Sequence, residues 1–339
     1  MQALKSNLFL SFVFSFFLFS LLAAYPIQSK WEVQLTQASA GPVLGGDNLF
    51  VVSDEGEITA LDRLDGKTAW TADISRQVGV PPLFYNNILY VGAEDGVYAF
   101  NSAGTPVGNI SFNSSVSCPP IASDGNVIVL TRDGTVYVLS SSSSLSRSNV
   151  IRTVRLSGEV DSSVYLYNKK LYVVLMNGKV FSVDPSTGSV VSLYDIGFSV
   201  WRASPLVLNN ILYVASEHSI YALTLQGKLT MSKSVSSGNL NSLSTDGNRI
   251  YAGSDDGHLY AVNQDGTVEW KYETNNSVKT KPLVIGDSIY FGSRDNNIYN
   301  VFKNGSLKWN FALSDWPSDM VQSEGILYLV SYDGKASAI

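Results

Sequence analysis

The chain has 339 residues, with 23 Lys or Arg and 29 Asp or Glu, and its formal net charge is −6. An acidic chain does not suit a protein that binds the phosphate backbone of nucleic acids, because such proteins need clustered cations. A single cysteine excludes an intramolecular disulfide and a multi-cysteine metal site, whereas 45% apolar residues suffice for a large folded core.

The N-terminal segment has the pattern of an export signal. Residues 8–24 are an apolar run of 17 residues broken by three serines, with Lys5 before it and no charge after it until Lys30. The alternative is a retained membrane anchor, although 17 helical residues span less than a hydrocarbon core of about 30 Å. We therefore assign residues 1–29 to a signal peptide or N-terminal membrane anchor. The remainder is expected to be exported, in the periplasm, the cell envelope or the extracellular space.

The rest of the chain repeats a unit of about 40 residues. The clearest copy is TKPLVIGDSIYFGSRDNNIYNVFKNGSLKW at residues 280–309, which consists of four short strand patterns separated by turns. One residue in the second strand marks each of the eight copies: Phe50, Tyr90, Ile128, Tyr172, Tyr213, Tyr251, Tyr290 and Tyr328. Four short strands per unit are typical of a β-propeller blade, so we predict an all-β, eight-bladed propeller domain over residues 30–339.

Turn residues support this division. Asn-Asn at 86–87 and 209–210 falls between first and second strands, and Asp-Gly at 133–134 and 256–257 falls between second and third strands. Such pairs tolerate the positive φ of tight hairpins. The serine run at 140–144 predicts an extended surface loop in the third unit.

The eighth unit is incomplete. It begins near Trp316 and reaches Ile339 without a fourth strand, whereas residues 30–35 (KWEVQL) form a strand with no unit before it. We expect residues 31–35 to pair with the C-terminal hairpin and close a monomeric ring, because closure removes exposed sheet edges.

The unit P-L-V-x-x-[DN]-x-[IL]-Y, with its Gly-x-x-x-Trp ending, resembles the PQQ-like propeller repeat. The ending is present at Gly66/Trp70, Gly266/Trp270 and Gly305/Trp309. The resemblance implies structural inter-blade docking for four tryptophans: Trp31, Trp70, Trp270 and Trp309. In the second, fourth and fifth units the corresponding residues are Gly108, Ser192 and Met231.

That family contains two groups. Quinoprotein dehydrogenases bind pyrroloquinoline quinone and calcium, are about twice as long and usually carry a disulfide between adjacent cysteines. The other group, which includes the BamB proteins of outer-membrane assembly, has lost the cofactor and uses the ring for docking. Length, blade count and the leader favour the second group, although the lipid-attachment cysteine of BamB is missing here. The resemblance therefore implies no cofactor, no catalytic residues and a non-enzymatic role.

Candidate partner contacts lie just before the innermost strands, in segments that border one mouth of the central channel. Trp201 and Trp316 align there with Val78, Val116 and Val278 of other units and would anchor a partner, since Trp is common in binding hot spots. The alternative is that they cap an apolar seam between blades. Charged residues in the same segments would meet a charged ligand or partner loop, or else line a hydrated wall: Arg202, Lys279, Lys281, Asp161 and Asp319.

Acidic residues also follow the second strands: Asp54, Glu55, Glu94, Asp95, Asp255, Asp256, Asp295 and Asp333. One or two such residues per blade cannot converge on a calcium ion, which needs six to eight oxygens. We interpret them as turn formers and predict no metal site.

These patterns favour an exported, non-catalytic scaffold that binds envelope proteins, as the BamB group does. One alternative is a small quinoprotein oxidoreductase that depends on pyrroloquinoline quinone. Another is a cell-surface propeller that binds a glycan or other ligand. Nucleic acid is not expected as a partner, and membrane association would occur through the N-terminal segment.

Overall fold

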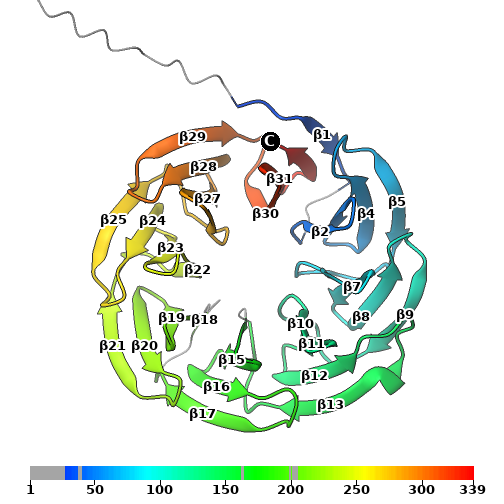
Figure 1. Cartoon of the computed structure of the whole chain (residues 1–339), viewed down its shortest axis with the longest axis horizontal. Helices are drawn as coiled ribbons and strands as arrows, with labels where there is room; N and C mark the ends of the chain where they lie inside the picture. The colour runs from blue at the N-terminus through cyan, green and yellow to red at the C-terminus, as the bar shows by residue number, and fades with distance from the viewer. Residues whose placement is uncertain (1–26, 37–39, 162–163, 198–199, 201–204) are drawn as a thin grey trace, which may run out of the picture.

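The computed structural model describes residues 27–36, 40–161, 164–197, 200 and 205–339, which form a ring of eight four-stranded antiparallel sheets (Figure 1). The chain passes round the ring in sequence order, and each sheet has its first strand nearest the central channel and its last strand at the circumference. The predicted all-β, eight-bladed propeller is confirmed. Within the described residues, no helix is long and apolar enough to cross a membrane.

The sheets are numbered in chain order. Sheet 1 contains β2 (Val43–Gly45), β3 (Asn48–Val52), β4 (Glu57–Asp62) and β5 (Thr68–Asp73), and sheet 2 contains β6 (Leu83–Tyr85), β7 (Ile88–Ala93), β8 (Gly96–Asn101) and β9 (Pro106–Ser111). Sheet 3 contains β10 (Ile121–Ser123), β11 (Asn126–Leu130), β12 (Thr135–Ser140) and β13 (Val150–Arg155), with the short 3-10 helix η1 (Arg147–Asn149) before β13. Sheet 4 contains β14 (Tyr165–Tyr167), β15 (Lys170–Val174), β16 (Lys179–Val183) and β17 (Val190–Asp195).

The second half of the ring follows the same order. Sheet 5 contains β18 (Pro205–Leu208), β19 (Ile211–Ser216), β20 (Ser219–Thr224) and β21 (Leu229–Ser234), and sheet 6 contains β22 (Leu240–Thr245), β23 (Ile250–Ser254), β24 (His258–Val262) and β25 (Val268–Glu273). Sheet 7 contains β26 (Leu283–Ile285), β27 (Ser288–Ser293), β28 (Asn297–Phe302) and β29 (Leu307–Ala312). Sheet 8 contains β30 (Pro317–Ser323), β31 (Ile326–Ser331), β32 (Lys335–Ala338) and β1 (Trp31–Gln34).

The core lies between neighbouring sheets. Middle strands are buried on both faces, as in β7, where every residue is buried, whereas the outer strand β5 alternates exposed and half-buried residues. The predicted marker residues share one register: Tyr90 pairs with Leu83 of the strand before it, as Tyr290 pairs with Leu283. The eight sheets are therefore equivalent copies of one unit.

The predicted ring closure is also confirmed. Strand β1 pairs antiparallel with β32, with Trp31 opposite Ala338 and Gln34 opposite Lys335. Glu32 forms an ion pair with Lys335, and the hydrogen bond from Lys335 lowers the pKa of the Glu32 carboxyl. The N-terminal strand thereby completes sheet 8 and removes its open edge.

Three of the four tryptophans lie against a glycine turn of the next sheet. Trp31 Nε1 donates a hydrogen bond to Arg63 O (3.1 Å), Trp70 Nε1 to Ser102 O (2.9 Å) and Trp270 Nε1 to Lys303 O (3.0 Å). The glycines beneath these indoles are Gly66, Gly104 and Gly305. Trp309 instead packs with Tyr290 and the apolar cluster of sheets 7 and 8.

Other side chains occupy the tryptophan position elsewhere. In sheet 3, Arg152 lies over Gly188 and donates hydrogen bonds to Thr187 O and Ser186 O. In sheet 5, Met231 occupies this position and lies against Gly266 together with Lys233. The serine run is inserted between β12 and β13 as predicted, but it is more than a surface loop. Leu145 just beyond it is buried and donates its N–H to Val107 O of sheet 2 (2.9 Å).

Deleting residues 30–36 should open the ring. Sheet 8 would lose an outer strand and the buried Trp31, whose loss alone would cost about 3–5 kcal/mol. At roughly 2 °C per kcal/mol for a domain of this size, the melting temperature should fall by about 10 °C. Thermal unfolding followed by circular dichroism measures this effect. Deleting residues 27–29, which precede β1, is the control and should change little; equal melting temperatures for both truncations would refute the closure.

Gly104→Ala should destabilise the seam between sheets 1 and 2. The added Cβ would lie 2.5 Å from Trp70 Cδ2, at a φ of 81° that disfavours alanine. We expect a loss of about 2–3 kcal/mol in denaturant unfolding. Gly125→Ala is a matched control, because Gly125 has a φ of 79° and no atom near its added Cβ. If both variants lose the same free energy, contact with the indole does not matter.

Candidate functional site

One end of the channel collects the segments singled out from the sequence. Because adjacent strands are antiparallel, the turn after each second strand lies at the same end as the segment that leads into each first strand; we call this end the mouth. A cavity of about 790 Å³ lies there, bordered by sheets 1 to 4 and sheet 8. Its charged and aromatic lining consists of Asp54, Glu55, Glu94, Asp161, Asp319, Arg132 and Tyr332.

Lys279 is engaged within the protein. It forms an ion pair with Asp255, and Asn241 Nδ2 donates to the same carboxylate (3.2 Å) and to Val278 O (2.7 Å). Burial raises the pKa of Asp255, but the hydrogen bonds from Lys279 and Asn241 outweigh it and leave the pKa below its usual value. Lys279 therefore connects sheets 6 and 7 before any partner binds.

Lys281 and Asp319 lie near each other, where sheet 7 meets sheet 8. Lys281 is exposed, whereas Asp319 is half-buried on β30 and accepts a hydrogen bond from Met320 N–H (2.8 Å). Gly41 lies so close that an added Cβ would be 2.9 Å from Asp319 Cβ. Burial raises the pKa of Asp319 to about 6, against the smaller opposing effects of Met320 N–H and the Lys281 charge.

Trp316 belongs to an aromatic and cationic stack. Arg294 lies over its ring, with the guanidinium carbon 4.0 Å from the ring centroid, and Tyr332 meets it edge-on at 5.0 Å. Trp316 is half-buried, whereas Tyr332 is 45% exposed and borders the cavity. Part of the Trp316 indole surface is therefore covered by Arg294 and Tyr332, and Tyr332 is the ring that faces solvent.

The register assigned to the two mouth tryptophans is wrong. The valine position is a buried one that packs against the preceding sheet, as Val278 packs against Gly253. In sheet 8 the residue that meets the corresponding Gly292 is Pro317, one residue after Trp316. Near Trp201, Val200 N–H donates to Met176 O as Val160 N–H donates to Arg132 O, so Val200 takes the valine position. Small or branched side chains fit this space, whereas an indole does not.

Trp201 and Arg202 themselves lie outside the described residues. The structure therefore places Lys279, Lys281, Trp316 and Asp319 at the mouth, around the junction of sheets 6, 7 and 8. Asp161 lines the cavity on the side of sheet 4.

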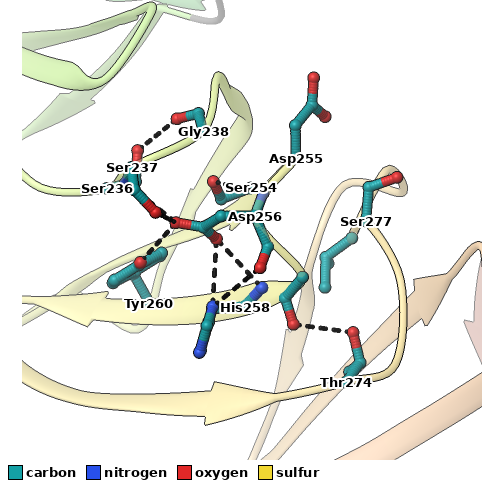
Figure 2. Close-up of polar contacts among 12 residues, drawn as sticks. Ser236, Ser237, Gly238, Ser254, Asp255, Asp256, His258, Tyr260, Thr274 and Ser277 are labelled. Atoms are coloured by element: carbon teal, nitrogen blue, oxygen red, sulfur yellow. Dashed lines mark hydrogen bonds and ion pairs between the residues drawn. The ribbon is translucent and has the colours of Figure 1, made fainter.

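A polar network that the sequence did not reveal joins consecutive sheets. Figure 2 shows its fullest form, in which the Asp256 carboxylate accepts hydrogen bonds from Ser237 N–H (3.0 Å), Ser237 Oγ (2.9 Å) and Tyr260 OH (2.7 Å). His258 Nδ1 lies 3.2 Å from the same carboxylate. Burial raises the pKa of Asp256, but the hydrogen bonds from Tyr260 and Ser237 lower it well below the usual value. Asp256 thus ties the exit of sheet 5 to sheet 6.

The same arrangement recurs in other sheets. Asp295 accepts from Asn275 N–H (3.0 Å) and from Tyr299 OH (2.7 Å), and Asp95 pairs with Arg76 (2.7 Å) and accepts from Tyr98 OH. These acids serve the fold, in line with their interpretation as turn formers. In the part of the chain that is described, no group of three or more His, Cys, Asp or Glu side chains could hold a metal ion. The tyrosine three or four residues after the acid is the signal that could have revealed the network.

A closed ring of eight four-stranded repeats with tryptophan seams defines a PQQ-like β-propeller. Within that class, the chain belongs to the family described as outer membrane protein assembly factor BamB, which matches residues 28–107, 86–199 and 197–339. This confirms the resemblance drawn from the repeat.

Individual relatives are distant. BamB of Nitrosomonas eutropha is 24% identical over 49% of this chain and 42% of the relative, and BamB of Yersinia pestis is 25% identical over 67% and 64%. BamB of Escherichia coli is 28% identical over 32% of this chain and 29% of the relative. In the first of these matches the chain spans less than half of the relative's length.

Solved structures agree on the fold. BamB from Moraxella catarrhalis is similar with a TM-score of 0.72 at 17% identity, covering 92% of this chain and 98% of that one. The computationally designed Ika8 protein is similar with a TM-score of 0.77 at 15% identity, covering 90% and 96%. At these identities the likeness concerns the fold alone.

Asp319→Asn tests the electrostatics of the mouth. The folded pKa of about 6 lies above the value of about 3.9 in an unfolded chain, so the folded state binds the proton more tightly. Stability therefore falls as the pH rises from about 4 to 6, and the deficit is complete above 6. We expect Asp319→Asn to raise the free energy of unfolding by about 1 kcal/mol above pH 7, after allowance for solvent screening, and to change little near pH 4. Equal effects at both pH values would contradict this account.

Proposed function

We propose that this protein is a non-catalytic interaction scaffold, exported to the cell envelope, that assists the assembly of envelope or outer-membrane proteins. The observation that carries the proposal is the family match, which extends from residue 28 to residue 339 and so includes the closing strand and all eight sheets. The relatives are named as outer membrane protein assembly factors, and we extend that role to this chain.

The ring suits a docking role because its shape is fixed before a partner arrives. Closure by β1 and the carboxylate contacts between sheets hold the mouth segments in place, which lowers the ordering cost of association. We propose that the partner contacts Lys281, Trp316 and Asp319, together with Trp201 and Arg202. Lys279 serves indirectly, since its ion pair with Asp255 positions the segment that carries Lys281.

The export assignment rests on the N-terminal segment. The apolar run at residues 8–24 follows Lys5 and precedes the folded ring, as a signal peptide or membrane anchor would. We propose that this segment delivers the ring to the envelope, where its partners are envelope proteins.

Affinity capture from the native envelope tests the function. With crosslinking, the full-length protein should recover a component of a barrel-assembly or secretion machinery. Trp316→Ala and Trp201→Ala should each reduce recovery about tenfold or more if the rings are contact anchors, since hot-spot residues contribute about 2 kcal/mol or more. Circular dichroism on the same variants should show retained folding; loss of folding would assign the tryptophans to packing instead.

Two experimental results would contradict the scaffold function and support a different one. Stoichiometric uptake of added pyrroloquinoline quinone and calcium, with oxidation of an alcohol or sugar in a dye-reduction assay, would make the protein an oxidoreductase. Binding on a glycan array without any captured envelope protein would make it a cell-surface glycan receptor.

A further inference from the structure

A second cavity adjoins the mouth cavity. It has a volume of about 780 Å³ and lies over the turn of sheet 1 and the exit of β5. Both cavities are lined by Glu55, Gln77 and Glu94, so they form one continuous depression from the channel toward the circumference. We call it the acidic groove, after seven carboxylates that line it: Asp54, Glu55, Glu57, Asp73, Glu94, Asp161 and Asp319.

None of these carboxylates forms an ion pair among the described residues, although Lys281 lies near Asp319 and Arg76 lies near Glu94. The arginines that border the groove are engaged elsewhere: Arg76 pairs with Asp95 (2.7 Å) and Arg132 with Glu159 (3.8 Å). Glu55 occupies the turn position of Asp256, yet within the described chain it receives no hydrogen bond from a neighbouring linker. The groove therefore carries negative charge that no ion pair among the described residues neutralises.

Two further features favour a cationic ligand. Burial raises the pKa of Asp54 as well as that of Asp319, so both carboxylates would be stabilised by an added positive charge. The 45%-exposed ring of Tyr332 borders the groove near Asp319 and offers a face for a cation–π contact.

The acids of the groove are too far apart to bind a single metal ion together. No three of them come close enough to form a metal site in the described structure, and they follow a depression from the channel to β5. A ligand that satisfies them must carry several positive charges along an extended chain. Lysine and arginine side chains on an extended polypeptide have that form.

We propose that the acidic groove is the docking site for an extended, basic segment of a partner protein. The proposal rests on the scaffold function and specifies the chemistry of the partner. Basic side chains of the segment lie along Asp73, Glu57, Glu55 and Glu94, and its leading end reaches Asp319 and Tyr332 at the channel.

Peptide binding by the purified ring tests the proposal. Fluorescence anisotropy would follow a labelled decapeptide of alternating lysine and serine, with a decapeptide of alternating glutamate and serine as the comparison. The basic peptide should bind, weaken steeply with salt, and lose about tenfold in affinity with the double variant Glu55→Gln/Glu94→Gln. Both residues are exposed, so the variant should fold, as thermal unfolding would verify.

A matched variant controls for net charge. Asp287→Asn/Glu324→Gln removes the same two charges from the opposite end of the channel, where both side chains are about 70% exposed. Its affinity for the basic peptide should be unchanged. An equal loss in both double variants, or no binding of the basic peptide, would overturn the proposal. Displacement of the basic peptide by millimolar calcium but not by equivalent sodium would also overturn it, in favour of a metal site.

Envelope capture separates this proposal from the scaffold function. If the intact protein captures envelope proteins and Glu55→Gln/Glu94→Gln captures them equally well, the groove is not the docking site although the scaffold function stands. If capture falls in this variant and not in the control variant, the groove is confirmed. If the intact protein captures nothing while the peptide binds, the scaffold function fails and the groove remains a basic-peptide site.

Discussion

The pairing of β1 with β32 is the constraint on which the rest of the structure depends. Each sheet buries its middle strands only because another sheet covers each face, and a ring is the arrangement in which every sheet has two neighbours. The four residue pairs between β1 and β32 complete sheet 8, so that it packs against sheet 1. The apolar cluster that these two sheets share contains Trp31, Tyr328 and Leu49. An open arc of the same eight sheets would expose two faces as well as an edge, so closure stabilises far more than its own hydrogen bonds.

Most of this architecture could be predicted from the sequence, because the same strand pattern recurs eight times along the chain. The marker tyrosines, such as Tyr90 and Tyr290, have a distinctive side chain and pair with equivalent positions of the preceding strand, so a period of about 40 residues located each blade. What could not be predicted depends on contacts between units. Arg152 occupies the tryptophan position of sheet 3, and Leu145, just after the serine insertion, contacts sheet 2. An alignment of the repeats does not show either of these contacts between sheets.

The candidate site was predicted in outline and not in detail. The segments before the inner strands do border the mouth, since that follows from antiparallel topology alone. However, the partners of Lys279 and Trp316 come from other turns, at Asp255 and Arg294, and a one-residue register error followed from aligning side chains without their hydrogen bonds. By sequence alone the acidic turns form one set, whereas the structure divides them into acids that tie sheets together, as Asp256 does, and acids that line the acidic groove, as Glu55 does.

The uneven distribution of tryptophans has a mechanical consequence. Indoles reinforce the run of sheets 6, 7, 8 and 1, whereas the corresponding positions of sheets 3 and 5 hold Arg152 and Met231, which have no aromatic ring to pack at the seam. Heat or pulling force should therefore fracture the ring on the side opposite the strand that closes it. Strands β1 and β32 pair in the reinforced arc, so a tether attached beside them would load the sturdiest part of the molecule.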